Sequence, residues 1–262
     1  MTEDITIYEL KKVDLKGATV IDGFPSVGLV SSIAANYLIN VLGMELIGIM
    51  DSMYFPTVSL VREGIPQNPV RIYASGRNGD EKSSEMVVVF ISEFQPPPNL
   101  VKPIAHAMLD WAEDQRCKML ISPEGVVIDR DDVPAEEDPA KGVEVYGVAS
   151  TVWMRELLAS NKVEEFREGV ITGVAGVLLN EGHRRDFNVS TLLAEAHPDY
   201  PDARAAAKIV EVIDRILQHT PLDAKPLYEE AERIESQLKL IHKQTEITKV
   251  KGAPQTVPNM YG

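Results

Sequence analysis

The sequence predicts an α/β fold in which a largely parallel sheet lies between helices. Short runs rich in β-branched residues alternate with helical patterns along the chain. Most of these runs are apolar throughout and lack the alternation expected of a strand with one wet face. Such strands are covered on both sides, which favours a parallel sheet with helices on either face. We expect strands at Thr19–Asp22, Leu46–Met50, Val70–Ala74, Met86–Ser92, Met119–Ser122 and Val170–Thr172.

Periodic apolar residues predict four helices in the same part of the chain. In the last of them, Ile209, Ile213 and Ile216 fall on one face, as in a helix that packs on a core. The proline-rich stretch Gln95–Asn99 marks a rigid entry into the second helix. The expected helices are Leu29–Leu42, Leu100–Gln115, Thr151–Ser160 and Ala203–Gln218.

The composition changes after residue 220, which divides the chain into a core domain at 1–220, a helical extension at 221–248 and a tail at 249–262. The extension carries apolar residues with a 4-3-4-3 spacing, with Glu and Lys in other positions. This spacing predicts a two-heptad coiled-coil seam that packs either against another copy of the chain or back on its own domain. The seam residues are Leu227, Ala231, Ile234, Leu238 and Ile241.

The tail ends in a tripeptide that suits docking into a partner. One glycine and two prolines between residues 249 and 259 forbid a continuous helix and favour an extended tether. Met260 then supplies an apolar anchor, Tyr261 an amphipathic ring, and Gly262 an unshielded terminal carboxylate. The alternative is an ordinary frayed terminus, which is what most chain ends are.

The composition indicates a globular protein without affinity for anionic surfaces. The 262 residues are 44% hydrophobic and 25% charged, with a formal net charge of −14. Nucleic acids and anionic membranes would be repelled by this charge, so a basic partner is favoured. The start of the chain lacks the pattern of a signal peptide, and we expect the protein in the cytoplasm. Cys117, the single cysteine, stands at a buried strand entry where we expect it to pack.

Two glycine clusters offer little for catalysis. The turn that contains Gly23, Phe24, Pro25 and Gly28 follows a strand and opens a helix, where glycine-rich loops cradle phosphates. It lacks the Lys and Ser/Thr of a P-loop and has the wrong glycine spacing for a dinucleotide fingerprint, so a rigid strand-to-helix turn is favoured. In the second cluster, which contains Gly173 and Gly176, close packing explains the small residues.

No other motif indicates a catalytic or metal site. The run Asn180–Asp186 is dense in ionisable groups, and Arg184 with Arg185 could hold a phosphate; a charged loop is the favoured interpretation. The five histidines show no metal-ligand spacing, and no serine stands in a nucleophile motif. We therefore expect neither metal nor cofactor, and no catalytic residue.

Three stretches together resemble the proteasome assembly chaperone family: Ile21–Val30, Gly169–Asn180 and Ser190–Ala207. The resemblance extends from about Val20 to Ile241. It implies an ATP-independent chaperone that binds α-type proteasome subunits and promotes assembly of the α-ring. It also implies a core similar to nucleoside phosphorylases, although a shared fold does not transfer activity.

The same resemblance gives the tail a meaning. Some archaeal-type members of the family, and the eukaryotic ones, carry a hydrophobic-Tyr-any (HbYX) C-terminus that enters pockets between α-subunits. Met260, Tyr261 and Gly262 match it position by position. The expected partner is the α-ring, bound by a homo-oligomer, for example a tetramer, that displays several tails. One alternative is a nucleoside- or phosphate-ester-processing enzyme that uses the Gly23–Gly28 turn with Arg184 and Arg185. Another is a regulator that binds finished proteasomes through the same tail.

Overall fold

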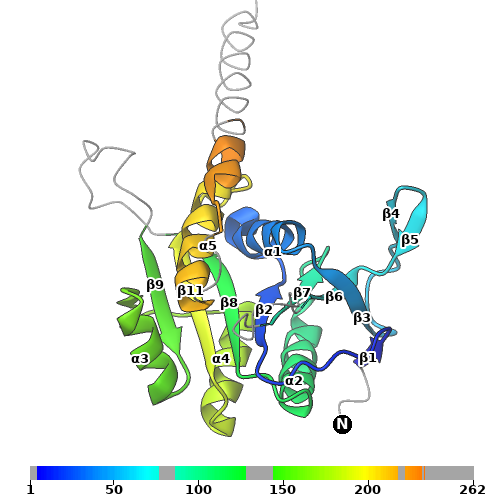
Figure 1. Ribbon diagram of the computed structural model, residues 1–262, viewed down its shortest axis with the longest axis horizontal. Coiled ribbons are helices and arrows are strands. Elements are labelled where there is room, and N and C mark those ends of the chain that lie inside the picture. Colours follow the sequence, from blue (N-terminus) through cyan, green and yellow to red (C-terminus); the bar gives the residue numbers. More distant parts are fainter. Residues whose placement is uncertain (1–4, 77–85, 128–143, 218–221, 232, 234–262) are drawn as a thin grey trace, which may run out of the picture.

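The computed structural model describes residues 5–76, 86–127, 144–217, 222–231 and 233. Within these ranges, nine strands form one sheet in the order β1-β3-β6-β7-β2-β8-β11-β9-β10. A hairpin of two further strands projects from the side of the body (Figure 1). The strands are β1 (Thr6–Glu9), β2 (Thr19–Gly23), β3 (Glu45–Asp51), β4 (Leu60–Arg62), β5 (Ile65–Gln67), β6 (Val70–Ala74), β7 (Val87–Ser92), β8 (Met119–Val126), β9 (Val145–Ala149), β10 (Glu164–Glu165) and β11 (Val189–Glu195).

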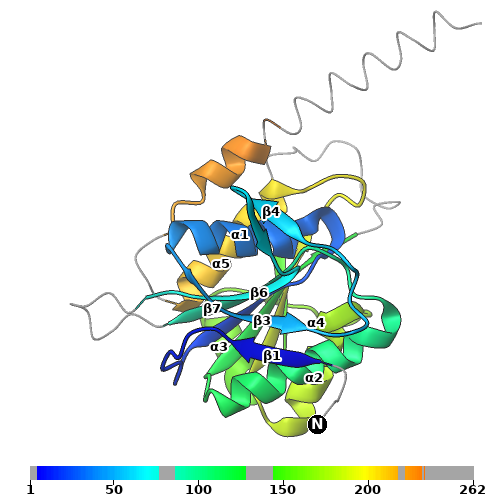
Figure 2. The ribbon, with the colours of Figure 1, turned by 90° about the vertical axis from the view of Figure 1, so that its right-hand side faces the viewer.

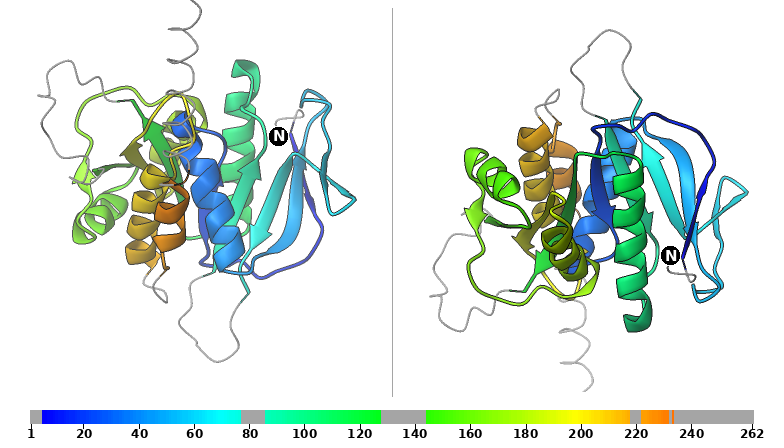
Figure 3. Two further views of the ribbon diagram at one scale, coloured as in Figure 1. Left: turned by 90° about the horizontal axis from the view of Figure 1, so that it is seen from above. Right: turned by 90° about the horizontal axis from the view of Figure 1, so that it is seen from below.

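Helices cover both faces of the sheet, in front of it and behind it in Figure 1. Two of them, α1 and α5, pack together on one face, and α2 and α4 pack together on the other. Figure 3 shows the two layers from above and below. The helices are α1 (Val30–Val41), α2 (Pro98–Asp114), α3 (Val152–Ser160), α4 (Gly173–Arg185) and α5 (Ala203–Leu217), with a short 3-10 turn η1 (Val27–Leu29) before α1.

The sheet is mixed, so the expectation of a largely parallel sheet is right only for its centre. The four central strands β7, β2, β8 and β11 run parallel. On one side β6, β3 and β1 continue the sheet antiparallel, and on the other β9 pairs antiparallel with β11. Figure 2 shows β1, β3 and β6 edge on. The central strands are buried on both faces because helices cover them, as their apolar sequences require.

Most expected elements are confirmed to within a few residues. Five of the six expected strands coincide with β2, β3, β6, β7 and β8, and the four expected helices with α1, α2, α3 and α5. The sixth strand, Val170–Thr172, is wrong: these residues form an extended approach to α4, and Val170 is 86% exposed. The expected charged loop Asn180–Asp186 is also wrong, because its first six residues are the last turns of α4.

The core lies in two apolar layers, one between the sheet and α2 with α4, the other between the sheet and α1 with α5. The predicted apolar face of α5 enters the second layer, where Ile209, Ile213 and Ile216 are at most 4% exposed. No helix in the described ranges is long and apolar enough to cross a membrane. The expected domain boundary near residue 221 lies outside the described residues, and the likeness to nucleoside phosphorylases stays a prediction.

Candidate functional site at the carboxyl ends of the central strands

The turn between β2 and α1 requires glycine at both ends. A Cβ atom at Gly23 would lie 2.6 Å from the backbone oxygen of Phe90. Gly28 has a φ of +60°, and a Cβ atom there would lie 2.9 Å from the backbone oxygen of His197. Because both constraints come from the backbone, the glycines fix the path of the turn. Phe24 and Pro25 lie between them and face a cavity.

This cavity of about 460 Å³ opens where β2, β8 and β11 end. Ligands of α/β proteins commonly bind at the carboxyl ends of parallel strands, and this volume falls in the usual range of about 300–1,000 Å³. The walls are mainly apolar, and the first turn of α4 closes one side. The lining residues are Phe24, Pro25, Ser26, Val27, Gln95, Pro96, Val101, Glu124, Gly125, Val126, Val127, Phe166, Val170, Ile171, Thr172, Gly173, Val174 and Leu193.

One acidic side chain, Glu124, lines the cavity, and the charge of a second, Asp22 on the neighbouring strand, acts on it. Asp22 is 1% exposed and accepts hydrogen bonds from the Phe24 N–H at 3.0 Å and the Ser122 hydroxyl at 2.7 Å. Burial raises the pKa of Asp22 to about 6 despite these bonds. Glu124 lines the cavity itself, and burial together with the charge of Asp22 raises its pKa well above its usual 4.5. The protonated form of Glu124 is therefore favoured more than in a solvent-exposed glutamate.

Asp22 and Ser122 belong to a polar row that crosses the sheet. The register pairs Ile21 with Ile121, which brings Asp22 beside Ser122, and it pairs Thr191 of β11 with Ser122. Thr191 is fully buried, and its hydroxyl makes no hydrogen bond with any described residue. Buried hydroxyl groups are normally satisfied, so this row is not explained by the packing of the fold.

Gly173 and Gly176 shape the α4 side of the cavity. Gly173 starts α4 with a φ of +72°. At Gly176 a Cβ atom would lie 2.4 Å from the backbone oxygen of Ile171, so the approach segment packs directly on the helix. The N-cap residue Thr172 makes no side-chain capping hydrogen bond. The first backbone N–H groups of α4 are therefore not capped by that side chain.

Arg184 and Arg185 lie at the other end of α4, about 18 Å away at 1.5 Å per residue. Arg184 pairs with Glu181, and Arg185 contacts Asp110 at 2.6 Å, Glu113 at 2.9 Å and Glu181 at 3.2 Å. Both cations are thus already paired. The structure does not bring them together with the Gly23–Gly28 turn, so the anion site of the enzyme alternative is not assembled.

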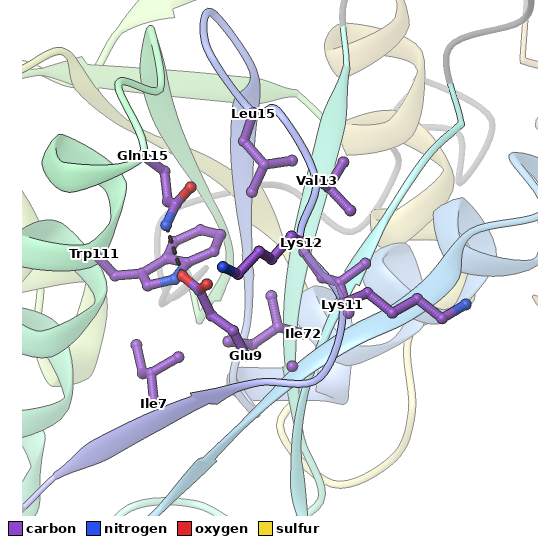
Figure 4. Close-up of a pocket in the computed structure, with 11 residues that line it drawn as sticks. Ile7, Glu9, Lys11, Lys12, Val13, Leu15, Ile72, Trp111 and Gln115 are labelled. Atoms are coloured by element: carbon purple, nitrogen blue, oxygen red, sulfur yellow. Dashed lines mark hydrogen bonds between the residues drawn. The ribbon is translucent and has the colours of Figure 1, made fainter.

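A smaller cavity of about 220 Å³ separates the N-terminal segment from α2. Figure 4 shows Trp111 of α2 and the C-cap residue Gln115 facing Glu9, with Lys12 extending toward them and Lys11 extending away. The Gln115 side-chain amide donates to Glu9 at 2.7 Å, which ties the segment to the helix. Because its volume lies below the usual range for ligand pockets, we interpret this cavity as a packing gap.

Cys117 and the acidic groups give no sign of a metal site. Cys117 is 7% exposed, and burial raises the pKa of its thiol to about 12, which leaves it protonated and inert. Its expected role in packing agrees with its place in the apolar layer beside α2. Among the described residues, no group of three or more His, Cys, Asp or Glu side chains could hold a metal ion.

The start of the C-terminal extension packs on its own domain. Residues 225–231 are helical, and Leu227, 7% exposed, joins the apolar layer of α1 and α5. The Tyr37 hydroxyl donates to the backbone oxygen of Asp223 at 2.5 Å, and the Tyr228 hydroxyl donates to Glu211 at 2.8 Å. Of the predicted seam, Leu227 and Ala231 are thus buried within the chain. Three seam residues and the docking tripeptide lie outside the described residues: Ile234, Leu238, Ile241, Met260, Tyr261 and Gly262.

Sequence reasoning did not find Asp22 and Glu124 as a pair. They lie on strands that are neighbours in the sheet but about a hundred residues apart in the chain. One signal was present: each is an acidic residue near the end of an otherwise apolar strand. Such a residue is rarely buried without a partner or a function.

A family model described as the PAC2 family matches residues 20–242. The chain belongs to the PAC2 family. The chain is similar to the crystal structure of Pyrococcus furiosus PbaA, described as an archaeal homolog of proteasome-assembly chaperone. It is 34% identical to PbaA, with a TM-score of 0.78 and coverage of 95% of this chain and 96% of that one.

The chain is also similar to two further proteins. The structure of Pyrococcus furiosus PbaB, described as an archaeal proteasome activator, shares the fold at 23% identity. Its TM-score is 0.78, over 92% of this chain and 99% of that one. An uncharacterized protein of Methanocaldococcus jannaschii is 28% identical over 244 residues, 93% of both chains. The proteasome assembly chaperone resemblance of the sequence is therefore confirmed at the level of the family.

Proposed function

We propose that this protein is an ATP-independent proteasome assembly chaperone that binds α-type subunits through Met260, Tyr261 and Gly262. The observation that carries the proposal is the match to PbaA over nearly the whole of both chains, together with a chain end that fits the docking motif. The proposal needs no catalytic residue, metal or cofactor. The cytoplasm, where proteasomes assemble, is the proposed location.

The tripeptide suits a pocket that is apolar inside and basic at its rim. Met260 and Tyr261 would fill the apolar part, and the terminal carboxylate would pair with a lysine there. The net charge of −14 favours such a basic target over an acidic one. A single tail binds weakly because a short segment loses conformational freedom when it docks.

The body of the protein would supply a rigid mount for the tail. Leu227, Tyr228 and Tyr37 fix the start of the extension to α1 and α5. Residues 249–262 could reach on the order of 45 Å beyond the extension, at about 3.3 Å per extended residue. We propose that Ile234, Leu238 and Ile241 join copies of the chain. Several tails on one homo-oligomer would then bind with an avidity roughly 10² or more above that of one tail.

Surface plasmon resonance on immobilised α-rings tests the docking. We expect Tyr261→Ala to weaken binding by about 1–3 kcal/mol per engaged tail, the usual range for an interface aromatic anchor. A tag appended after Gly262 should be nearly as harmful, since a captured carboxylate tolerates no further residue. Gly262→Ala is the matched control and should matter much less. Binding that is indifferent to both the tag and Tyr261→Ala would contradict the proposal.

A second readout separates assembly from activation. The 34% identity to PbaA, against 23% to PbaB, favours a role in assembly. We therefore expect the intact chain to speed the formation of α-rings from free α-subunits, followed by native mass spectrometry. Stimulated peptide hydrolysis by finished proteasomes, without any effect on ring formation, would instead favour a regulator.

A further inference from the structure

The cavity at the carboxyl ends of the central strands plays no part in tail docking. It is about 460 Å³ in volume, and Glu124, the titratable side chain in its lining, makes no hydrogen bond with any described residue. No Lys, Arg or His lines it in the part of the chain that the structure describes. Among the described residues, no lining side chain therefore supplies a counter-charge to Glu124.

We propose that this cavity binds a small molecule that carries a primary ammonium group on an apolar stem. Phe24, Val101 and Leu193 are among the walls that would bury the stem. The ammonium group would lie against Glu124, with Asp22 beneath it as a second negative charge. A cation at this position compensates the carboxyl groups of the partly buried Glu124 and the buried Asp22, which no cation in the described lining balances.

The polar row beneath the cavity supports a built site rather than an incidental gap. Residues in α2 and α4 cover this face of the sheet with apolar side chains, yet Asp22, Ser122 and Thr191 place polar groups there. The Ser122 hydroxyl and the Phe24 N–H orient the Asp22 carboxylate. The fully buried Thr191 hydroxyl, on the same face and two residues before the lining residue Leu193, has no partner among the described residues. Each of these groups carries a desolvation cost that packing does not require.

The proposal has a definite pH dependence. Among the described residues, the titratable groups at the site are Glu124 in the lining and Asp22 beneath it, and both have raised pKa values. An ammonium ligand favours their ionised forms, so its binding releases protons at any pH where either carboxyl group is protonated in the free protein. The affinity should therefore rise as the pH increases, and level off above the raised pKa of Glu124.

Isothermal titration calorimetry with hexylamine, hexan-1-ol and hexanoate tests the chemistry, using the full-length chain. The three probes share one stem and differ in their head group. We expect hexylamine to bind at least about tenfold more tightly than hexan-1-ol, with proton release seen as a difference in heat between two buffers of unlike ionisation enthalpy. Tighter binding of hexanoate would indicate that the α4 N-terminus governs the site and would overturn the proposal. Equal binding of all three, or none, would overturn it too.

Two substitutions locate the binding. Glu124→Gln should lower hexylamine affinity about tenfold or more, abolish most of the proton release and leave hexan-1-ol binding unchanged. Glu156→Gln, an exposed position on α3 outside the lining, changes the net charge equally and should have no effect. If Glu124→Gln does not fold, the proton release of the unaltered protein still decides. Equal losses in both variants would mean that long-range charge attracts the amine, which contradicts a site at Glu124.

Discussion

The two ends of α4 treat charge in opposite ways. At its C-terminal end, Arg185 is 14% exposed and contacts three carboxylates, and the neighbouring Arg184 pairs with Glu181. At its N-terminal end, Glu124 is partly buried in the cavity lining and Asp22 is buried nearby, and no cation lines the cavity among the described residues. At the C-terminal end each arginine is paired with a carboxylate. At the N-terminal end the carboxyl groups lose hydration without gaining a cation among the described residues.

This difference shows why density of charge is a poor guide to a site. The ionisable run at 180–186 is the conspicuous feature in the sequence. In the structure, Arg185 of this run forms ion pairs that join α4 to α2. Within α4 itself, the hydrogen bond from Arg184 is the chief cause that lowers the pKa of Glu181 to about 2. Buried groups with raised pKa values are the better candidates for function, because the fold alone does not require them.

The largest expected effect is a gain in stability from Asp22→Asn. The rise of the Asp22 pKa from 3.8 to about 6 means that the folded state holds this proton more tightly than the unfolded chain. The contribution of Asp22 to the free energy of unfolding therefore falls as the pH rises from about 4 to above 6, by about 3 kcal/mol. An amide keeps the hydrogen bonds to Phe24 and Ser122 without the charge.

Urea denaturation at several pH values measures this effect. Asp22→Asn should be more stable than the unaltered protein by up to about 3 kcal/mol above pH 6, and the difference should vanish near pH 4. The exposed Asp114→Asn is the matched control and should show no such dependence. If Asp22→Asn is the less stable protein at pH 8, then Asp22 stabilises the fold, and the contrast between the ends of α4 fails.

The second prediction concerns the C-terminal end of α4, where the arginines are paired. Arg185→Ala leaves Glu181 without one of its two Arg partners beside α2, and we expect the free energy of unfolding to fall by about 2 kcal/mol. This value lies between the small effect of surface pairs and the 3–5 kcal/mol of buried ones, since Asp110 and Glu113 are 54% and 39% exposed. Arg184→Ala, whose side chain is 65% exposed, should cost clearly less. Thermal denaturation measures both variants. If Arg184→Ala and Arg185→Ala lose the same free energy of unfolding, burial does not distinguish the two arginines.

The contrast also explains which parts of the fold the sequence could predict. Five central or near-central strands are mainly apolar runs, and periodic apolar faces identify α1, α2, α3 and α5. Strand β11 was missed because Ser190 and Thr191 interrupt its apolar run, although both are fully buried. Helix α4 was missed because it begins with glycines and ends in charges. Apolar periodicity cannot detect a helix or strand when glycines of a turn, charged residues of ion pairs or buried polar residues replace its apolar positions.

The direction of the flanking strands and the pairing of site residues were beyond the sequence for a different reason. Whether β6 or β9 runs parallel to its neighbour depends on how the chain returns to the sheet, which local pattern does not record. Likewise, Asp22 meets Glu124 only because β2 and β8 are adjacent. The family resemblance covered the missed segments β11 and α4, because it rests on residues in order and not on their periodicity.

The smallest expected effect tests the polar row itself. Thr191→Val replaces the unpartnered hydroxyl with a methyl group of nearly the same shape, so it removes a buried polar atom without opening a cavity. We expect the free energy of unfolding to rise by up to about 1 kcal/mol, measured by urea denaturation at pH 7. Thr151→Val is the contrasting variant, because the Thr151 hydroxyl donates to Asn188 at 2.7 Å and caps α3; it should lose about 1 kcal/mol. A loss of stability in Thr191→Val would mean that its hydroxyl supports the fold. Thr191 would then have a structural role, like the arginines at the C-terminal end of α4. The difference between the two ends of α4 would rest on Asp22 and Glu124 alone.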